Sequence, residues 1–434
     1  MRIWLSLAIA SAWSRRLALL IVVFSVSISV ALILSVVQLR ADARSSFSEA
    51  VSGVDLIVGP RGSPTELLMY TVFQLGRATR NMPADVEQRL SAVRGVSWVV
   101  PIQLGDTYRD YPVWGSRPEL FERLKVRGRP VAFAQGRSFA DPRSAGLQSV
   151  FELVLGAELA TRFGHQLQDS LVLTHGAGGP LAQKHEQTPF RVVGILAPTG
   201  GPIDRAALVS LEGFEAMHLG WGLGEFQGLG GAFAPAHPLQ SLGSIGELAP
   251  REITSLLVGL ESRGQVFAVR RAIESTQGTP LMAVLPGVAL DDLWRVLAVG
   301  ENSLLLVGAL VALSSVLSIS AVLLVSISSR RREFAVLRAV GARPQGLLLM
   351  LVLESVFVSL AGMALGLCAH QLLIWASADR LRTLMGISLS PLSIPAEGWL
   401  SLAAVMLMAV LASLLPAVRA YRLSLQDGLN PPYA

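Results

Sequence analysis

Three histidines at regular spacing are one candidate for chemistry in this sequence. His165, His175 and His185 lie ten residues apart, and imidazole is a common ligand of transition metals. The zinc-protease pattern fails at His185-Glu186, because Pro189 occupies the place of the second histidine. Histidines in surface loops are more common than metal ligands, so we expect no bound metal, with a histidine site as the alternative that the pattern leaves open.

A carboxylate inside an apolar segment is a second candidate. Glu354 lies about two turns into the apolar run 347–378, and an ionisable group in a membrane is costly enough to suggest a function such as a proton relay. Its position near the cytoplasmic end of this run would let it pair with Arg338. We therefore favour a structural role for Glu354 over a proton relay.

Motifs of nucleotide-binding and hydrolytic enzymes are missing from the sequence. No Walker A pattern, G-x-x-x-x-G-K-[ST], occurs, and the only lysines are Lys125 and Lys184. There is no G-x-S-x-G elbow, and the G-x-G at 222–224 lacks the third glycine of a dinucleotide site. The single cysteine, Cys368, excludes a disulfide within the chain. We expect no enzyme activity and no cofactor bound by this chain.

Composition and apolar runs predict a membrane protein. Hydrophobic residues make up 52% of the chain and charged residues 15%, with a mean hydropathy of +0.52. A helix of about 20 mainly apolar residues crosses a bilayer, and four segments qualify: 17–37, 302–329, 347–378 and 398–418. The net charge of +5 suits anionic lipid headgroups better than nucleic acid in such a chain.

The distribution of arginine predicts the orientation of these spans. Cytoplasmic flanks carry the excess of basic residues, and arginines gather at 2–16, 330–343 and 419–422. We therefore expect both termini in the cytoplasm and residues 40–301 on the outer side. A cleaved signal peptide within residues 1–43 is the less favoured alternative, because its apolar stretch is longer than such peptides usually carry.

The first two spans continue beyond the apolar run into a predicted stalk. Residues 38–49 prolong the first span, and residues 290–301 lead into the second with helical spacing of their apolar side chains. The predicted order is an amphipathic cytoplasmic helix at 1–16, the first span with its stalk at 17–49, the second stalk and span at 290–329, a cytoplasmic segment at 330–346, the third span at 347–378, a short outer loop at 379–397, the fourth span at 398–418 and a cytoplasmic tail at 419–434.

The long outer segment has the pattern of a mixed α/β domain. Short runs rich in Val, Ile and Leu predict strands at 54–59, 96–101, 171–174, 191–196, 207–210 and 253–260. Apolar residues at helical spacing predict helices at 84–93 and 266–276. Residues 220–231, which are rich in glycine, predict a loop.

The segment between the second and third spans has a pattern of its own. It reads R-R-R-E-F-A-V-L-R-A-V-G-A at 330–342. Phe334, Leu337 and Val340 are spaced three apart and so lie on one side of a short helix, which Gly341 and Pro344 end. From composition alone, an ordinary basic cytoplasmic loop remains the alternative.

This segment, the following span with Glu354-Ser355, Gly362 and Gly366, and the ending at 416–422 resemble the FtsX-like permease domain of MacB-type ABC transporters. Outer segments at 54–59, 154–160 and 190–196 resemble the extracytoplasmic domains of MacB and of lipoprotein-releasing permeases. Gly362 and Gly366 also form G-x-x-x-G, which lets helices approach closely, so we expect them on a helix-packing face.

The resemblance implies an α-helical membrane protein with four transmembrane helices and a large mixed α/β extracytoplasmic domain. That domain would hold a porter-like subdomain at 50–145 and 250–289 and an inserted small subdomain at 146–249. The short cytoplasmic helix would be the coupling helix that docks on a separate ATPase subunit, which binds ATP and magnesium. By position, the ATPase-coupling residues would be Arg331, Arg332, Glu333, Phe334, Leu337, Arg338 and Gly341.

The function that the resemblance implies is that of the permease subunit of a split, mechanotransmission-type ABC transporter in the bacterial inner membrane. A second permease copy would complete a homodimer, and a periplasmic adaptor or lipoprotein is a possible further partner. No nucleic-acid partner is expected. The alternative is an FtsX-like, non-transporting regulator of an extracytoplasmic enzyme, which the length of the outer segment disfavours because such regulators usually carry a smaller outer domain.

Overall fold

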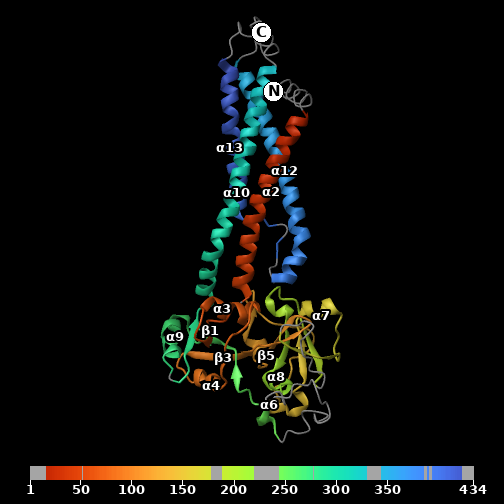
Figure 1. Cartoon of the computed structure of the whole chain (residues 1–434), viewed down its shortest axis with the longest axis vertical. Coiled ribbons are helices and arrows are strands. Elements are labelled where there is room, and N and C mark those ends of the chain that lie inside the picture. Colours follow the sequence, from red (N-terminus) through yellow and green to blue (C-terminus); the bar gives the residue numbers. More distant parts are fainter. Residues whose placement is uncertain are drawn as a thin grey trace, which may run out of the picture. The chain divides into compact units, whose positions relative to one another are not determined.

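The computed structural model describes residues 16–50, 52–176, 188–218, 244–276, 278–329, 344–385, 389–390 and 393–422. The chain divides into two compact units (Figure 1). We call residues 1–43, 296–381 and 389–434 the helical unit, and residues 44–295 and 382–388 the α/β unit. The predicted amphipathic helix at 1–16 (apart from Arg16), the glycine-rich loop at 220–231, the segment 330–343 and most of the tail at 419–434 lie outside the described residues.

Four long helices run through the described part of the chain: α2 (Arg16–Ala50), α10 (Pro286–Ser329), α12 (Pro344–Met385) and α13 (Ala396–Arg422). Each contains an apolar stretch long enough to cross a membrane. A helix satisfies its backbone polar groups internally, as a lipid environment requires. The prediction of four candidate membrane helices is therefore confirmed.

The helical unit packs through rows of small and branched apolar residues. Val22, Val26, Val30 and Leu34 follow one another at four-residue spacing along α2 and are buried. They share a cluster with apolar residues of the other long helices, among them Ala312, Val316, Leu323, Leu351 and Val405. Side chains four apart lie on one face of a helix, so one stripe of α2 faces its neighbours.

The α/β unit is organised around one large twisted sheet. Its strand order is β10 (Ser170–Leu171), β12 (Phe190–Leu196), β9 (Glu152–Leu155), β13 (Ala207–Ser210), β5 (Tyr111–Ser116), β3 (Val96–Gln103), β15 (Ser255–Leu260), β1 (Leu56–Pro60) and β16 (Leu281–Val284). Off this path, β4 (Asp106–Tyr108) pairs with β5 and with β11 (Thr174–His175), and β8 (Phe133–Gly136) pairs with β12. The pairs β12–β9 and β13–β5 are parallel, and the other pairs of this sheet are antiparallel.

Short elements complete the α/β unit. Two small ladders join β14 (Glu252–Ile253) to β2 (Met82–Pro83) and β6 (Lys125–Val126) to β7 (Arg129–Pro130). The α-helices are α3 (Pro64–Leu68), α4 (Val86–Ser91), α5 (Leu120–Arg123), α6 (Pro142–Ala145), α7 (Ala157–Phe163), α8 (Leu211–Met217) and α9 (Val266–Glu274). Single turns of other helix types are η1 (Met69–Phe73), η2 (Leu147–Ser149), η3 (Pro202–Arg205), η6 (Ile245–Leu248) and η7 (Arg263–Gln265).

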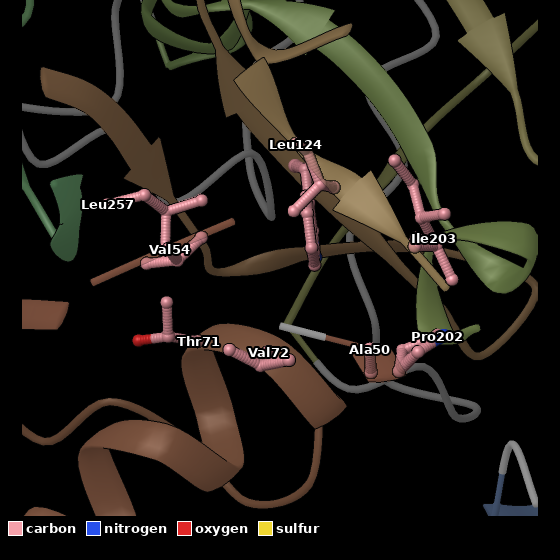
Figure 2. Close-up of a pocket in the computed structure, with 10 residues that line it drawn as sticks. Ala50, Val54, Thr71, Val72, Leu124, Pro202, Ile203 and Leu257 are labelled. Carbon is pink, nitrogen blue, oxygen red and sulfur yellow. The ribbon is translucent and has the colours of Figure 1, made fainter. Parts of the chain in front are cut away.

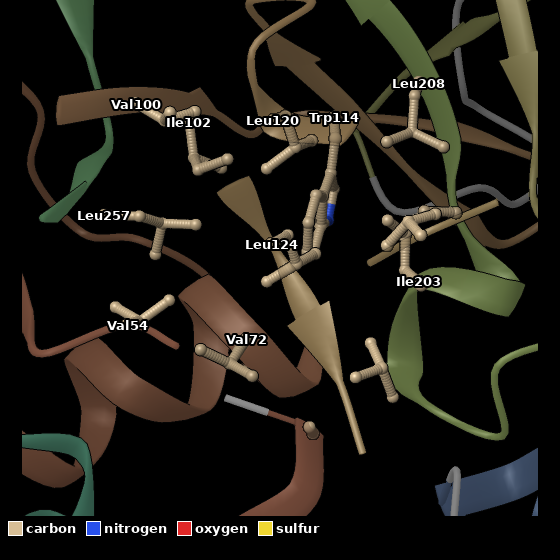
Figure 3. Close-up of a cluster of buried hydrophobic side chains, with 14 of the residues drawn as sticks. Val54, Val72, Val100, Ile102, Trp114, Leu120, Leu124, Ile203, Leu208 and Leu257 are labelled. Atoms are coloured by element: carbon tan, nitrogen blue, oxygen red, sulfur yellow. The ribbon is translucent and has the colours of Figure 1, made fainter. Parts of the chain in front are cut away.

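Both faces of the sheet are covered. In β1, Ile57 joins one apolar cluster, whereas its neighbours Leu56 and Val58 join another. Successive strand residues point to opposite faces, so these clusters lie on opposite sides of the sheet. Figure 3 shows part of the first cluster, with Trp114 and Leu257 among its members.

Most of the predicted elements have a counterpart in the structure, and two predicted strands are each divided into two. The strand predicted at 171–174 is divided, because Leu171 pairs with β12 while Thr174 pairs with β4. The strand predicted at 253–260 is likewise divided, since Ile253 pairs with Met82 and β15 begins at Ser255. Each change of pairing partner interrupts the strand, which local hydrophobicity does not reveal.

Some boundaries also differ from the sequence prediction. Helix α10 begins at Pro286 rather than at 290, and a proline is favoured in the first turn of a helix. Helix α12 continues to Met385, into the loop predicted at 379–397. The porter-like subdomain at 50–145 and 250–289 and the inserted subdomain at 146–249 stay predictions. In the structure, β13 of the second segment pairs with β5 of the first, so the two segments share one sheet.

Candidate functional site

Helices α2 and α10 are joined by polar and close apolar contacts inside the helical unit. The hydroxyl oxygen of Ser315 lies 2.7 Å from that of Ser25 and 3.1 Å from that of Ser29. Further along, a Cβ atom added at Gly308 would lie 2.8 Å from Cγ1 of Ile33. Small residues and interhelical hydrogen bonds are the usual means of holding helices together in lipid. The two helices therefore pack tightly through this part of the unit.

Charged side chains in the next turns of α2 contact other segments of the helical unit. Arg40 forms an ion pair with Glu301 of α10, with an N–O distance of 2.8 Å. Asp42 is buried, and its Oδ2 accepts hydrogen bonds from the side-chain amide of Gln38 at 2.9 Å and from the backbone N–H of Ser390 at 3.0 Å. The Arg40–Glu301 ion pair is thus a further contact between α2 and α10, whereas Asp42 joins α2 to the segment before α13.

The last turns of α2 and the first turns of α10 belong to the core of the α/β unit. The rings of Phe47 and Trp294 meet edge to face with centroids 5.7 Å apart, and Phe47 also contacts Phe73 at 4.3 Å. The guanidinium of Arg44 lies 5.5 Å from the centre of the Trp294 ring. Aromatic contacts of this kind add to the free energy gained by burial. The ends of both helices are thus anchored among apolar side chains.

A small apolar pocket lies beside the end of α2 (Figure 2). Ala50, the last residue of α2, lines it together with Val54, Val72, Ile203 and Leu257. The hydroxyl of Thr71 is buried at this pocket and has no hydrogen-bond partner within the described residues. Among the described residues that line the pocket, none is an acid or a base, so they indicate packing rather than catalysis.

The predicted packing glycines of α12 lie against α2. A Cβ atom at Gly362 would lie 2.7 Å from Cβ of Val26, and one at Gly366 would lie 2.7 Å from the backbone oxygen of Ser27. Real Cβ atoms do not approach other atoms so closely. Only a glycine at each position allows the two backbones to come this near.

Comparison with models of protein families identifies the family of this chain. The model of the MacB-like periplasmic core domain matches residues 19–276, more than half of the chain. The model of the FtsX-like permease C-terminal domain matches residues 305–425. The chain belongs to the MacB/FtsX-like family of ABC transporter permeases. Members of this family are membrane components of ABC transporters that work with an ABC ATPase.

Solved structures of the outer regions of such permeases are also similar to this MacB/FtsX-like chain. The periplasmic region of MacB from Actinobacillus actinomycetemcomitans matches with 13% identity and a TM-score of 0.35, over 57% of this chain and 94% of that one. The extracellular domain of the noncanonic ABC-type transporter YknZ from Gram-positive bacteria matches with 15% identity and a TM-score of 0.31, over 53% and 98%. No curated protein sequence matches. The family assignment therefore rests on the two family models.

The predicted coupling residues of this MacB/FtsX-like permease lie inside the FtsX-like match. They are Arg331, Arg332, Glu333, Phe334, Leu337, Arg338 and Gly341, all outside the described residues. Glu354 is described and is buried, with 3% of its surface exposed. It borders a small gap that is also lined by Leu19 and Val22 of α2 and Leu323 of α10. Pairing of Glu354 with Arg338 stays a prediction.

The three histidines that the sequence offers as metal ligands do not form one described cluster. In His165, Nε2 lies 3.0 Å from the hydroxyl of Tyr108 and Nδ1 lies 3.2 Å from Oδ2 of Asp169. His175 lies instead beside Asp106 and His218, and His185 is outside the described residues. Burial lowers the pKa of His218, but its hydrogen bond to Asp106 and the charge of that carboxylate raise the pKa above its ordinary value.

Sequence reasoning missed Asp106 and His218 as neighbours of His175. They lie 69 and 43 residues away from it along the chain. The pairing of β4 with β11 brings Asp106 opposite His175, and α8 ends immediately before His218. No local periodicity carries this information, because it arises from long-range strand pairing.

Proposed function

We propose that this chain is the permease subunit of a MacB-type, mechanotransmission ABC transporter of the bacterial inner membrane. Two copies of the permease pair with a separate ATPase subunit. ATP binding closes the ATPase, the segments at 330–346 move with it, and α2 and α10 carry the motion to the outer domain. Cargo is then handled on the outer side of the membrane rather than carried through the bilayer.

The observation that carries this proposal is that α2 contacts α10 at several separate points within each unit. Both helices exceed the roughly 20 residues that cross a bilayer, with 35 residues in α2 and 44 in α10. In the helical unit they meet at Ser25 and Ser315. In the α/β unit they meet at Phe47 and Trp294. Two helices held together at several levels can transmit a displacement along their length without separating.

Family membership supports the same assignment. An FtsX-like permease works with an ABC ATPase, and the sequence carries no Walker A motif. We prefer a MacB-type transporter to an FtsX-like regulator because such regulators usually carry a smaller outer domain than the segment between α2 and α10 of this chain. Within the described residues, the four long helices bury mainly apolar side chains against one another, which supports a mechanical role over a pore.

The experiment that tests this proposal uses the double variant F334D/L337D. These positions lie one helical turn apart, and burying each apolar side chain in an ATPase cleft would contribute about 1.5–3 kcal/mol. Two aspartates remove that contribution and place charges in the cleft. The purified variant should remain a folded dimer but lose its co-purifying ATPase and all stimulated ATP hydrolysis.

The matched control is A335D/A339D, which places the same two charges on the opposite side of the predicted helix. It should retain at least part of the ATPase association. Normal ATPase association and stimulated hydrolysis in F334D/L337D would overturn the proposal. An outer wall hydrolase whose activity depends on ATP and on this chain would instead support the FtsX-like regulator.

A further inference from the structure

Asp106, His175 and His218 converge at one edge of the sheet in the α/β unit. Nδ1 of His175 lies 2.8 Å from Oδ1 of Asp106 and 3.1 Å from Nε2 of His218. Nε2 of His218 lies 3.3 Å from Oδ2 of Asp106. One potential metal-ligating atom from each of the three residues lies within 4.8 Å of the other two, although the residues come from separate segments of the chain.

The same atoms can face one another either through protons or through a shared cation. Each nitrogen that faces the centre carries either a proton or a lone pair. Where both carry protons, each N–H can donate to one oxygen of Asp106. Where both carry lone pairs, the two nitrogens and the carboxylate present three donors to a single cation at the centre.

The surroundings of His218 select the tautomer that a metal needs. Nδ1 of His218 lies 2.8 Å from the carbonyl oxygen of Phe214. A carbonyl can only accept, so Nδ1 carries the hydrogen and the lone pair of the neutral ring lies on Nε2. Ring N–H groups of metal-bound histidines commonly donate to a backbone carbonyl in this way, which fixes the orientation of the ring.

The backbone around the cluster is held in place by contacts that do not involve the ligating atoms. The N–H of Gly176 donates to the oxygen of Gly105 at 3.1 Å, and the hydroxyl of Thr107 donates to the oxygen of Gly176 at 2.7 Å. In α8, Phe214 packs so closely on Gly115 of β5 that a Cβ atom at Gly115 would lie 3.0 Å from it. The cluster is thus positioned by the fold.

We propose that Asp106, His175 and His218 form a binding site for one divalent transition-metal ion, with Zn²⁺ as the best match. Two imidazole nitrogens and a carboxylate oxygen are ligands that Zn²⁺ accepts. Ligands at about 2.0–2.1 Å from a tetrahedral ion lie about 3.3 Å apart. The two nitrogens here are 3.1 Å apart, His175 Nδ1 lies 2.8 Å from Oδ1 of Asp106, and His218 Nε2 lies 3.3 Å from its Oδ2.

Three protein ligands leave one position of a tetrahedral ion open. The side chain of Asp106 is fully buried, whereas that of His175 is 46% exposed, so the site is reached from solvent on the histidine side. The ion connects the end of α8 to the paired strands β4 and β11. Its open coordination position can bind water or another oxygen or nitrogen ligand. This site is independent of the transporter proposal, because it involves no residue of the coupling segment.

The test uses the full-length protein in detergent, purified with a tag that contains no histidine, stripped with a chelator and dialysed. Calorimetric titration with Zn²⁺ should show one ion per chain, and Co²⁺ should give the visible spectrum of a tetrahedral site. Loss of a protein ligand should cost more than the roughly 10–100-fold that loss of an outer contact costs. H175A, H218A and D106N should therefore each weaken Zn²⁺ binding by at least about 100-fold.

The matched control is H165A, which removes a nearby histidine whose ring nitrogens face Tyr108 and Asp169. It should bind Zn²⁺ as the wild type does. Asp106 is buried, so H175A replaces D106N as the test if D106N fails to fold. The side chain of His175 is 46% exposed, and H175A should therefore fold. Ni²⁺ or Cu²⁺ can bind more tightly than Zn²⁺. If H175A weakens that binding by the same factor, the result supports the site and assigns it to that ion instead of Zn²⁺. Wild-type Zn²⁺ affinity in folded H175A and H218A, or no binding of any of these ions, overturns the proposal.

Discussion

Ser25 and Ser315 are 290 residues apart in the sequence, yet their hydroxyl oxygens lie 2.7 Å apart. This contact joins α2 to α10 within segments that are mainly apolar. A hydrogen bond between membrane helices contributes only about 0.6 kcal/mol on average. Its main effect is therefore to fix the register of the two helices rather than to supply most of their stability.

A cysteine pair should trap this register. In a C368A background, S25C/S315C should form a disulfide on mild oxidation, because the hydroxyl oxygens that the sulfurs replace lie 2.7 Å apart, near the roughly 2.0 Å length of an S–S bond. The pair S25C/S314C is the control, since Ser314 is exposed and adjacent on the helix. Peptide mass spectrometry measures the bond. If the helices move as one body, the oxidised S25C/S315C protein keeps its ATP-coupled activity; loss of activity would show that they slide past each other.

The glycines of α12 should tolerate no side chain. G362A and G366A place a methyl group 2.7 Å from atoms of α2, and overpacking of this kind typically costs about 1–3 kcal/mol. The control is G300A in α10, where nothing lies within 4 Å of the added Cβ. That variant should be neutral or more stable by up to about 1 kcal/mol, because alanine favours helix. Thermal unfolding in detergent, followed by circular dichroism, compares them; equal midpoints for all three would contradict the close packing.

Phe47 should stabilise the start of α10. F47A removes its contacts with Trp294 and Phe73, and we expect a loss of about 2 kcal/mol, below the 3–5 kcal/mol of a fully buried phenylalanine. Hydrogen exchange of residues 287–294 should accelerate. The control is F267A in α9, which is 69% exposed and should change little. Unchanged exchange in F47A would mean that these aromatic contacts do not anchor the helix.

Acid should weaken the α/β unit through Glu152. Burial raises the pKa of Glu152, but hydrogen bonds from Arg137 and the N–H of Ala140, with the charges of Arg137 and Arg191, lower it below the usual 4.5. The unfolded chain lacks these partners and titrates near the usual value. The stabilisation is therefore fully present above pH 4.5 and is lost as the pH falls through the lower folded pKa.

The comparison of wild type with E152Q measures this effect. At pH 7 the variant should unfold at a lower temperature than wild type, and the difference should shrink as the pH is lowered below about 4. E274Q is the control, because the Arg270–Glu274 pair on α9 is exposed and such pairs contribute little. A difference between wild type and E152Q that stays constant from pH 7 to strongly acidic conditions would show that the ion pair is not its source.

The sequence predicts the helices better than the outer sheet. Apolar runs identified the four long helices, because a membrane helix needs about 20 apolar residues in succession. Within the sheet, β1 was predicted from its run of Leu56, Ile57 and Val58, whereas β5 was missed because Pro112 and Gly115 are poor strand formers. The register of β4 against β11, which brings Asp106 to His175, depends on the whole fold.

Glu354 should tolerate replacement by glutamine. Its side chain is buried with 3% exposed and lies among Leu19, Val22 and Leu323, where a polar contact matters and a full charge is costly. E354Q keeps the size and the hydrogen-bonding capacity, so its free energy of unfolding should stay within about 1 kcal/mol of wild type. E354L is the matched control, similar in volume but unable to hydrogen-bond, and should lose about 1–3 kcal/mol because it leaves a polar partner unsatisfied. Thermal unfolding and ATP hydrolysis by the reconstituted complex are measured together. An E354Q protein that folds and assembles normally but no longer couples ATP hydrolysis would assign Glu354 to proton or ion movement instead.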